Sequence, residues 1–568
     1  MPRDTENAAT IWRWLVPCMI VATTATAFLP ALQNGFVIWD DDINFLNNPH
    51  YRGLGWTELR WMFTTFLLGH YQPLSWMSWG LDYLIWGKDP FGYHLTNLCL
   101  HSANAVLFYF ISRRLLEPVL HGLDRDGNLN LTMAAACAAL LFAIHPLRVE
   151  SVVWITERRD VLSAHFIFWT LICYFRAAAS QDRGCGETRW LVGALAFYLL
   201  SLLSKAWGMT LPMLLLILDV YPLRRLDGNP ASWFGPIARK VILEKAPFVV
   251  LAVIFAILAV FAQESAGAMA SWERYPLSRR IAQAFYGIAF YLWKTLWPTG
   301  LSPLYESSEH LDLLNWPYLV SAVMVIGITA VLFGLRRRWP AGLAVWVCYV
   351  ALIAPVSGIA QAGPQLVADR YSYLSCLGWA LLAGTGFVYL RCYCEKKRRV
   401  FGSGVLTVAV SVLIAMGFST GKQTRVWHDT ESLWRHTVTL DPNSSIARNQ
   451  LGNALADRGA LEEAIEQYQH ALRIRPAHAG THYNLAMALD DRGDLDGAMQ
   501  HYEEAARLDP AHAHAHNNLG AILFQRGELE QAIDHFQQAL SARPELAQAR
   551  DNLSRALASR ARTERATQ

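Results

Sequence analysis

Two patterns of hydrophobic positions divide the chain near residue 420. Before it, apolar stretches recur that approach the length of about 20 residues needed for a helix to cross a bilayer. After it, apolar residues return every few positions among polar ones, as in amphipathic helices packed in water. We therefore predict an all-α protein in which a polytopic membrane domain over 1–420 precedes a soluble helical domain.

The apolar stretches predict eleven membrane spans, the first of them uncleaved. We interpret 281–298 as an interfacial or re-entrant segment, because a full crossing there would place the basic run 336–338 outside. When 281–298 is not counted as a crossing, Lys and Arg concentrate in the loops on one side of the membrane. This predicts a cytoplasmic N-terminus and an extracytoplasmic C-terminal domain. Without a eukaryotic targeting signal, we place the chain in a bacterial inner membrane. The predicted spans are 11–33, 93–112, 131–147, 161–178, 190–204, 207–223, 246–263, 317–335, 341–356, 371–391 and 403–420.

The soluble part repeats with a period of 34 residues, seen at Pro442, Pro476, Pro510 and Pro544. Small and aromatic residues keep the same step, which is the tetratricopeptide pattern of paired antiparallel helices. We predict three full repeats and a capping helix over 441–560. A linker or lead-in helix over 421–440 precedes them, and a disordered tail over 561–568 follows.

A column of primary amides recurs at the same period: Gln450, Asn484, Asn518 and Asn552. On the first helix of each repeat this position faces the concave groove. Each amide offers one acceptor and two donors, so the column can pair with the backbone of an extended acceptor polypeptide. The alternative is that asparagine is simply a common residue at this position of the repeat.

Composition narrows the functional classes. The chain is 53% hydrophobic and 17% charged, with a net charge of +3, which does not indicate a nucleic-acid-binding protein. Its nine cysteines form no CxxC pair, so we predict neither a disulfide framework nor a zinc site. His512 and His516 are spaced four apart, but no carboxylate or thiol lies at a matching distance along the chain, and we interpret them as loop histidines.

Charged residues gather in the loops that this topology places outside. Asp40, Asp41 and Asp42 directly follow the first span, where crowding and lost solvation can raise the pKa of one carboxyl until it serves as a base. A solvated loop is the alternative. Arginine and lysine in the later outer loops suit phosphate binding, although ordinary interfacial charges would look the same. The later candidates are His145, Arg148, Glu150, Glu157, Arg158, Arg159, Asp160, Lys205, Asp369 and Arg370.

Four segments together carry a family resemblance: WDDDINFLNNP from 39, YQPLSWMSWGLDYLIWGKDPFGYHLTNLCLHSANAVLFY from 71, ALLFAIHPLRVESVVWITERRDVLSAHF from 139 and LLSKAWGMTLP from 202. With the repeats that follow, they resemble the transmembrane and tetratricopeptide repeat-containing protein O-mannosyltransferases and their bacterial relatives in the GT-C superfamily. The resemblance implies a GT-C-like membrane domain. It also implies sugar transfer from a polyprenyl-phosphate donor to an acceptor hydroxyl outside the cytoplasm.

The resemblance also assigns roles to individual positions. The family's acidic pair matches Asp40 and Asp41, and one of them is expected to take the proton from an acceptor Ser or Thr hydroxyl. Asp160 or Glu150 would orient the base or the acceptor. The Arg-x-Asp-like and Ser-Lys-x-x-Gly elements match 158–160 and 204–208. The expected donor-phosphate ligands are Arg158, Arg159, Lys205 and Arg370. Relatives often carry arginine where this chain has Gln72, and an acidic residue where it has Ala206.

Our hypothesis is an inverting glycosyltransferase whose partners are a polyprenyl-phosphate sugar, an acceptor polypeptide held by the repeats, and membrane lipid. We expect no metal cofactor, with carboxylate-bound Mg²⁺ or Mn²⁺ as the alternative. Two other functions fit the same pattern. One is a non-enzymatic membrane-anchored scaffold for envelope assembly, and the other is a ligase or polymerase of lipid-linked glycans.

Overall fold

The computed structural model describes residues 2–121, 129–181, 186–269, 271–273, 275–307, 315–360, 363–397 and 399–567. These residues form two compact units, Met1–Asp429 and Thr430–Gln568. The predicted all-α class is confirmed: in the described ranges the strand pairing is limited to β1 (Tyr305–Glu306) with β2 (Gln365–Val367), which are antiparallel. The first unit extends past the predicted boundary at 420 because α17 (Arg399–Val426) continues through it.

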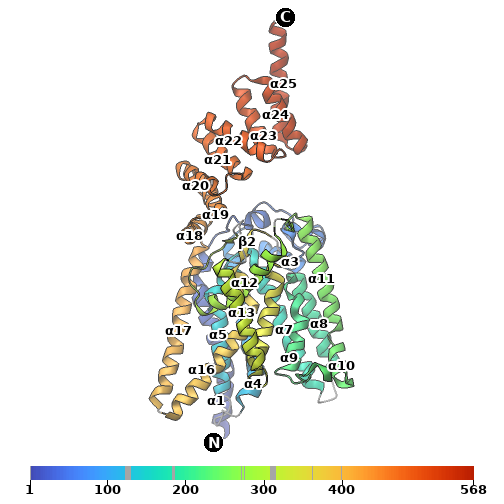
Figure 1. The fold of residues 1–568 in the computed structure, drawn as a ribbon, viewed down its shortest axis with the longest axis vertical. Helices are drawn as coiled ribbons and strands as arrows, with labels where there is room; N and C mark the ends of the chain where they lie inside the picture. The colour runs from blue at the N-terminus through green and yellow to red at the C-terminus, as the bar shows by residue number, and fades with distance from the viewer. Residues whose placement is uncertain are drawn as a thin grey trace. The chain divides into compact units, whose positions relative to one another are not determined.

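The first unit consists of long apolar helices joined by short helices and loops (Figure 1). Its long helices are α1 (Pro2–Phe28), α4 (Pro90–Leu120), α5 (Leu129–Ala143), α7 (Arg158–Gln181), α8 (Glu187–Ser204), α11 (Ala246–Ser265), α12 (Leu277–Leu296), α13 (Trp316–Gly334), α14 (Pro340–Ile353), α16 (Leu377–Lys397) and α17. Its shorter helices include η1 (Leu29–Gln33), η2 (Asp42–Leu46), α2 (Trp56–Thr64), η3 (Leu67–Gly69), α3 (Pro73–Trp86), η4 (Pro146–Arg148), α6 (Val149–Val153), η5 (Ile155–Glu157), η6 (Ala206–Thr210), α9 (Leu211–Val220), η7 (Pro230–Phe234), α10 (Pro236–Leu243), η8 (Ala354–Val356), η9 (Asp369–Tyr371) and α15 (Ser372–Ser375).

Between six and eight spans meet the length and apolarity of a bilayer crossing among the described residues. Six are single runs: Trp14–Gln33, Pro90–Leu120, Ile155–Ser180, Pro236–Ser265, Trp316–Gly334 and Gly402–Val426. Two more are bent pairs, Leu129–Ala143 with Pro146–Val153 at 54° and Asp369–Ser375 with Leu377–Lys397 at 60°. The predicted stretches 190–204, 207–223 and 341–356 also fold as helices, but these are short or begin with polar residues. The count of eleven spans stays a prediction.

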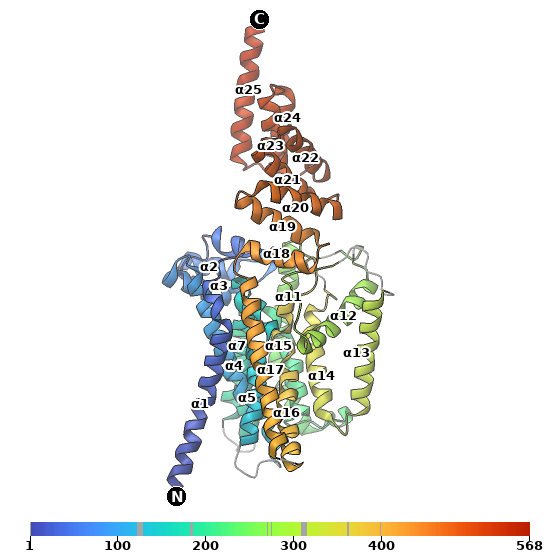
Figure 2. The ribbon, with the colours of Figure 1, turned by 90° about the vertical axis from the view of Figure 1, so that its left-hand side faces the viewer.

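The two bends bring polar segments to one end of the bundle. The first occurs at Pro146, which lacks the N–H needed to continue α5 as a helix. The second separates η9 and α15 from α16, and η9 packs against α6. Figure 2 shows α17 running beside α16 in the same unit, and α17 also packs against α1. Asn34, just after η1, donates a hydrogen bond from Nδ2 to the Thr424 carbonyl at 3.0 Å, which ties the first and last long helices together at this end.

The second unit is the predicted solenoid of helix pairs. Glycines 459, 493 and 527 take φ values of +83°, +89° and +81° at the turn inside each pair, a region that glycine enters without a Cβ clash. A Cβ on Gly452 would lie 2.5 Å from the ring of Tyr468, so the small residue sets the helix approach. α25 continues to Thr567, through most of the tail that we expected to be disordered. The helices are α18 (Thr430–Leu440), α19 (Ser445–Asp457), α20 (Leu461–Ile474), α21 (Ala479–Arg492), α22 (Leu495–Leu508), α23 (Ala513–Gln525), α24 (Leu529–Ala542) and α25 (Ala547–Thr567).

Candidate active site

Asp41 is a buried acceptor in the segment that follows η1. Its side chain is 1% exposed, and one carboxylate oxygen accepts the Val37 N–H at 3.1 Å. The other oxygen accepts the Thr156 hydroxyl at 2.6 Å and the Thr156 N–H at 3.3 Å. Thr156 in turn accepts Nδ2 of Asn44 at 3.1 Å. Asp41 therefore fastens the segment after α1 to η5, 115 residues later in the chain.

Asp40 keeps its carboxylate open. The residue is half-buried, and within the described ranges no group donates a hydrogen bond to its carboxylate. Burial raises the pKa of Asp40 to about 6, although the positive charges of Arg159 and Arg370 pull it down. Burial also raises the pKa of Asp41 to about 7, against the hydrogen bonds from Thr156. Of the two aspartates, Asp40 is the one whose lone pairs can receive a substrate proton.

Three cations surround Glu157 beside this aspartate. Arg159 binds the Glu157 carboxylate through two nitrogens, at 2.5 and 3.2 Å. The Lys205 Nζ lies 2.8 Å from the same carboxylate and also contacts Asp160. The Arg370 Nε is 3.4 Å from Glu157. Glu157 is therefore the shared counter-ion of the cluster, a role that sequence reasoning did not give it.

Lys205 and Arg370 are more accessible than the acids that hold them, whereas Arg159 is buried. Glu150 accepts the Arg370 N–H at 2.9 Å and pairs with its guanidinium. Glu150, Glu157 and Asp160 are at most 3% exposed, whereas Lys205 is 17% and Arg370 12% exposed. The buried carboxylates hold the cations in place, and the accessible edges of the cations can receive an anion.

Arg158 does not belong to this cluster, contrary to our expectation. Its fully buried guanidinium lies 2.5 Å from Asp82 and donates to the Asn97 side chain at 2.6 Å and to the Tyr93 carbonyl at 2.8 Å. Successive helical residues point about 100° apart around the helix axis, so Arg158 and its neighbour Arg159 face different partners. Arg158 joins α7 to α3 and α4 and is closed to a ligand.

His70 is a candidate that sequence reasoning missed. It follows Leu68 and Gly69, which both take left-handed backbone angles, with φ of +53° and +72°. Gln263 of α11 donates to the Gly69 carbonyl at 2.7 Å and holds this turn. Burial and the nearby cations, Arg159 first, keep the pKa of His70 well below its ordinary value, so the imidazole is neutral. His70 could have been identified because it directly precedes YQPL, the segment in which Gln72 departs from the relatives.

Gln72 and Ala206, the two departures from the relatives, line one small cavity. This cavity has a volume of about 50 Å³ and is also lined by His70 and Lys205. Gln72 is 2% exposed, and its Oε1 has no hydrogen-bond partner in the described part of the chain. The two positions at which this chain differs from its relatives therefore line the same cavity, next to the predicted phosphate ligand Lys205.

Other charged candidates have structural partners. His145 accepts the Leu147 N–H at 3.2 Å and contacts the Thr295 carbonyl at 3.1 Å. Arg148 is 2% exposed and lies over the Tyr373 ring. Asp369 accepts the Tyr305 hydroxyl at 3.0 Å. These residues support the end of the bundle where the cluster lies.

Across the described ranges, no group of three or more His, Cys, Asp or Glu side chains could hold a metal ion. His512 caps α23 by accepting the Ala515 N–H at 3.1 Å, whereas the His516 Nδ1 contacts Nδ1 of His535 at 3.1 Å. The two histidines of the four-residue spacing therefore have separate partners. The metal dependence of the chain stays untested.

The amide column of the repeats is half-buried, and its members pair in part with asparagines outside the column. The Asn484 Nδ2 donates to Asn449 at 3.1 Å and to Asn453 at 2.9 Å. Asn552 donates to Asn517 at 3.1 Å, and the remaining members are Gln450 and Asn518. These contacts orient the amides, and the binding of an acceptor peptide by this column stays a prediction.

Known proteins match both units. Two tetratricopeptide repeat models match residues 452–490 and 483–547. The solved first TPR of Spaghetti (RPAP3) bound to an HSP90 peptide is 22% identical, with a TM-score of 0.21, over 21% of this chain and 96% of that chain.

The curated relatives extend over most of the chain. Protein O-mannosyl-transferase Tmtc3 of Drosophila melanogaster is 23% identical over 460 residues, covering 71% of this chain and 48% of the relative. Protein O-mannosyl-transferase TMTC1 of Mus musculus is 25% identical over 574 residues, covering 80% and 59%. The chain thus spans about half the length of the curated relatives it matches. Its curated homologues are repeat-containing protein O-mannosyltransferases, the family that its motifs resemble.

Proposed function

We propose that the chain is an integral-membrane glycosyltransferase that moves a sugar from a polyprenyl phosphate to a Ser or Thr hydroxyl of a polypeptide, on the extracytoplasmic face. The observation that supports this most directly is the open Asp40 carboxylate facing Arg159 and Arg370. A base next to accessible cations suits a reaction that removes a proton and expels an anion. The names of the relatives make mannose the sugar to test first.

In the proposed step, Asp40 takes the acceptor proton as the hydroxyl oxygen bonds to the anomeric carbon. The bond between that carbon and the phosphate oxygen breaks, and the phosphate leaves with the electron pair. Arg159, Lys205 and Arg370 stabilise the negative charge that develops on this oxygen. Attack from the face opposite the phosphate inverts the anomeric centre, through an oxocarbenium-like state.

Asp41 acts as a positioning residue in this scheme. Its oxygens accept hydrogen bonds from Val37 and Thr156, so Asp41 fixes the backbone from which the Asp40 side chain projects. Glu150 and Asp160, which we expected to orient the base or the acceptor, pair with Arg370 and Lys205. Their proposed role is to keep the cations in place for the leaving phosphate.

A lipid donor fits the surroundings of Lys205. The small cavity beside Lys205 and His70 is walled on its other side by Phe255, Leu258 and Ala259 of α11. These residues lie in a run that is long and apolar enough to cross a bilayer. A prenyl chain along this wall would bring its phosphate to Lys205, with the neutral His70 imidazole as a further N–H donor. The repeats would hold the acceptor through their amide column.

The decisive experiment is sugar transfer in proteoliposomes that contain the purified chain, a polyprenyl-phosphate mannose and a Ser/Thr-rich peptide. We expect Asp40→Asn to lower kcat by about 10³-fold, the range of general-base loss. Asp42→Asn is the matched control, because Asp42 lies two residues after Asp40 at the start of η2, and it should keep most of the activity.

Other outcomes would favour the alternative functions. Full activity of Asp40→Asn would contradict the proposed base. Transfer to a lipid-linked glycan but to no peptide would indicate the ligase or polymerase. A scaffold would show no transfer under any condition, and its cellular role would survive Asp40→Asn but not deletion of 441–568.

A further inference from the structure

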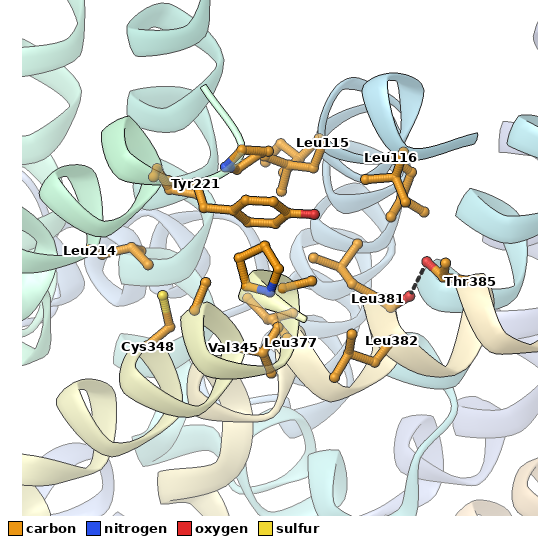
Figure 3. Close-up of a pocket in the computed structure, with 18 of the residues that line it drawn as sticks. Leu115, Leu116, Leu214, Tyr221, Val345, Cys348, Leu377, Leu381, Leu382 and Thr385 are labelled. Atoms are coloured by element: carbon orange, nitrogen blue, oxygen red, sulfur yellow. Dashed lines mark hydrogen bonds between the residues drawn. The ribbon is translucent and has the colours of Figure 1, made fainter. Parts of the chain in front are cut away.

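A second cavity lies inside the first unit, away from the cluster around Glu157. It has a volume of about 550 Å³, within the range of small-molecule sites. Its walls come from α4, α7, α9, α14 and α16 and are almost entirely apolar (Figure 3). The residues labelled in Figure 3 are Leu115, Leu116, Leu214, Tyr221, Val345, Cys348, Leu377, Leu381, Leu382 and Thr385.

Two polar lining residues of this cavity, Tyr221 and Arg338, lie toward the end of the bundle away from Lys205. η6 and α9 begin directly after Lys205 and end at Val220. At 1.5–2.0 Å per residue, they carry the chain about 20–25 Å to Tyr221. That distance is a large part of the roughly 30 Å hydrocarbon core. Tyr221 therefore lies near the interface that the predicted topology makes cytoplasmic.

One hydroxyl points into the apolar interior. The Tyr221 ring crosses the cavity in Figure 3, and its hydroxyl is directed toward apolar side chains. Among the described residues this hydroxyl has no hydrogen-bond partner, whereas the Thr385 hydroxyl is satisfied by the Leu381 carbonyl at 2.8 Å. A polar group in such surroundings is stabilised by a ligand that brings an acceptor.

Two arginines bring positive charge to the Tyr221 part of the cavity. Arg338 is exposed and lines the cavity. Arg224 is also exposed, and it lies close enough to Tyr221 for its charge to act on the phenol. A ligand that matches all three features has an apolar chain for the walls, an acceptor for Tyr221 and an anion for the two arginines.

We propose that this cavity binds an anionic glycerophospholipid of the cytoplasmic leaflet. An acyl chain fills the apolar interior, an ester carbonyl accepts the Tyr221 hydroxyl, and the phosphate pairs with Arg338 and Arg224. A polyprenyl phosphate has no carbonyl to offer Tyr221, so the unpaired hydroxyl favours the ester lipid. The anionic surface of a cytoplasmic leaflet also attracts arginines at this interface.

Native mass spectrometry of the purified full chain, released from detergent, tests the proposal with defined lipids. We expect dioleoyl phosphatidylglycerol to bind about tenfold more tightly than dioleoyl phosphatidylcholine, and the double variant Arg224→Gln, Arg338→Gln to abolish that preference. Arg336→Gln is the matched control, because Arg336 folds back to donate to the Phe333 carbonyl at 2.9 Å. Equal binding of the two lipids by the wild-type chain would contradict the proposal.

The ester contact has its own test, which begins with the wild-type protein. The diether analogue of phosphatidylglycerol lacks the carbonyls, and we expect it to bind wild-type protein about fivefold more weakly, as for the loss of one hydrogen bond. Tyr221→Phe should remove this difference. Tyr389→Phe should not, because the Tyr389 hydroxyl already donates to the Val119 carbonyl at 3.4 Å. Equal affinity of diester and diether, or displacement of phosphatidylglycerol by polyprenyl phosphate, would overturn the assignment without affecting the proposed transferase.

Discussion

The two units of this protein build their polar surfaces in opposite ways. Around Glu157, charged side chains come from segments far apart in the chain, and the acids are buried beneath the cations they hold. In the repeats, polar contacts join residues at nearly the same spacing each time, as in Asn484 with Asn449 and Asn552 with Asn517, both 35 residues apart. A periodic surface can be recognised from spacing alone, whereas a converging one depends on the tertiary fold.

Substitutions of the adjacent Arg158 and Arg159 test whether the site is defined by the charged residues that meet around Glu157. Arg159→Met removes a cation whose charge acts on Asp40, while Glu157 keeps Lys205 and Arg370, so we expect kcat to fall about 100-fold with little loss of stability. Arg158→Met leaves Asp82 buried without its partner and should cost about 3–5 kcal/mol of unfolding free energy. Thermal unfolding in detergent and turnover of the folded fraction separate the two effects. Equal losses of activity at equal stability would place Arg158 in the site after all.

The dependence of kcat/KM on pH tests whether Asp40 is the base. Asp40 must be ionised to act as a base, and its pKa is about 6. We therefore expect kcat/KM to rise about tenfold per pH unit below pH 6 and to level off above it. Arg159→Gln removes a charge that lowers this pKa and should move the rise to higher pH. A flat profile between pH 5 and 8 would mean that another group accepts the proton.

A substitution in the amide column tests whether the repeats bind an acceptor peptide through it. Asn484→Ala removes a half-buried amide from the groove, and we expect the affinity for an extended acceptor peptide to fall about fivefold, the value of one hydrogen bond. Asn443→Ala is a matched control on the exposed turn before α19, outside this column. Fluorescence anisotropy with a labelled peptide measures both. Unchanged affinity would leave asparagine as an ordinary repeat residue.

A smaller effect concerns paired histidines in the repeats. His482 and His501 face each other through Nδ1 at 3.0 Å, as do His516 and His535 at 3.1 Å. Burial, with the partner histidine next, lowers the pKa of His501 and of His535. The unfolded chain then binds more protons, so stability present above pH 6.5 is lost as the pH falls below it.

We expect the Tm of the repeat unit to drop by about 2–4 °C between pH 7.5 and 5.5. The double variant His501→Gln, His535→Gln should reduce that drop, since Gln467 occupies the matching position in the preceding repeat and accepts from Arg448 at 2.9 Å. Circular dichroism melts at the two pH values provide the measurement. A drop of the same size in the variant would assign the pH effect to other groups.

Several parts of the candidate site were predictable, and the reasons differ. Asp40 and Asp41 stood out because three adjacent carboxylates follow an apolar run. Lys205 stood out only through a motif resemblance. Glu157 as the shared counter-ion was not predictable, because two of its three cationic partners are distant in sequence: Lys205 lies 48 residues away and Arg370 still farther. His70 was missed because a single histidine beside an aromatic residue has no distinguishing pattern.

The sequence by itself determined the membrane domain, the period of the repeats and the acidic segment after the first span. These features depend on apolar length and on spacing along the chain, which are local properties. Only the tertiary structure decided that Asp41 is occupied and Asp40 open, and that Arg158 is buried against Asp82 while Arg159 faces the cluster. The reason is that hydrogen bonding and burial depend on which distant segments pack together, and neighbours in sequence point in different directions once a helix forms.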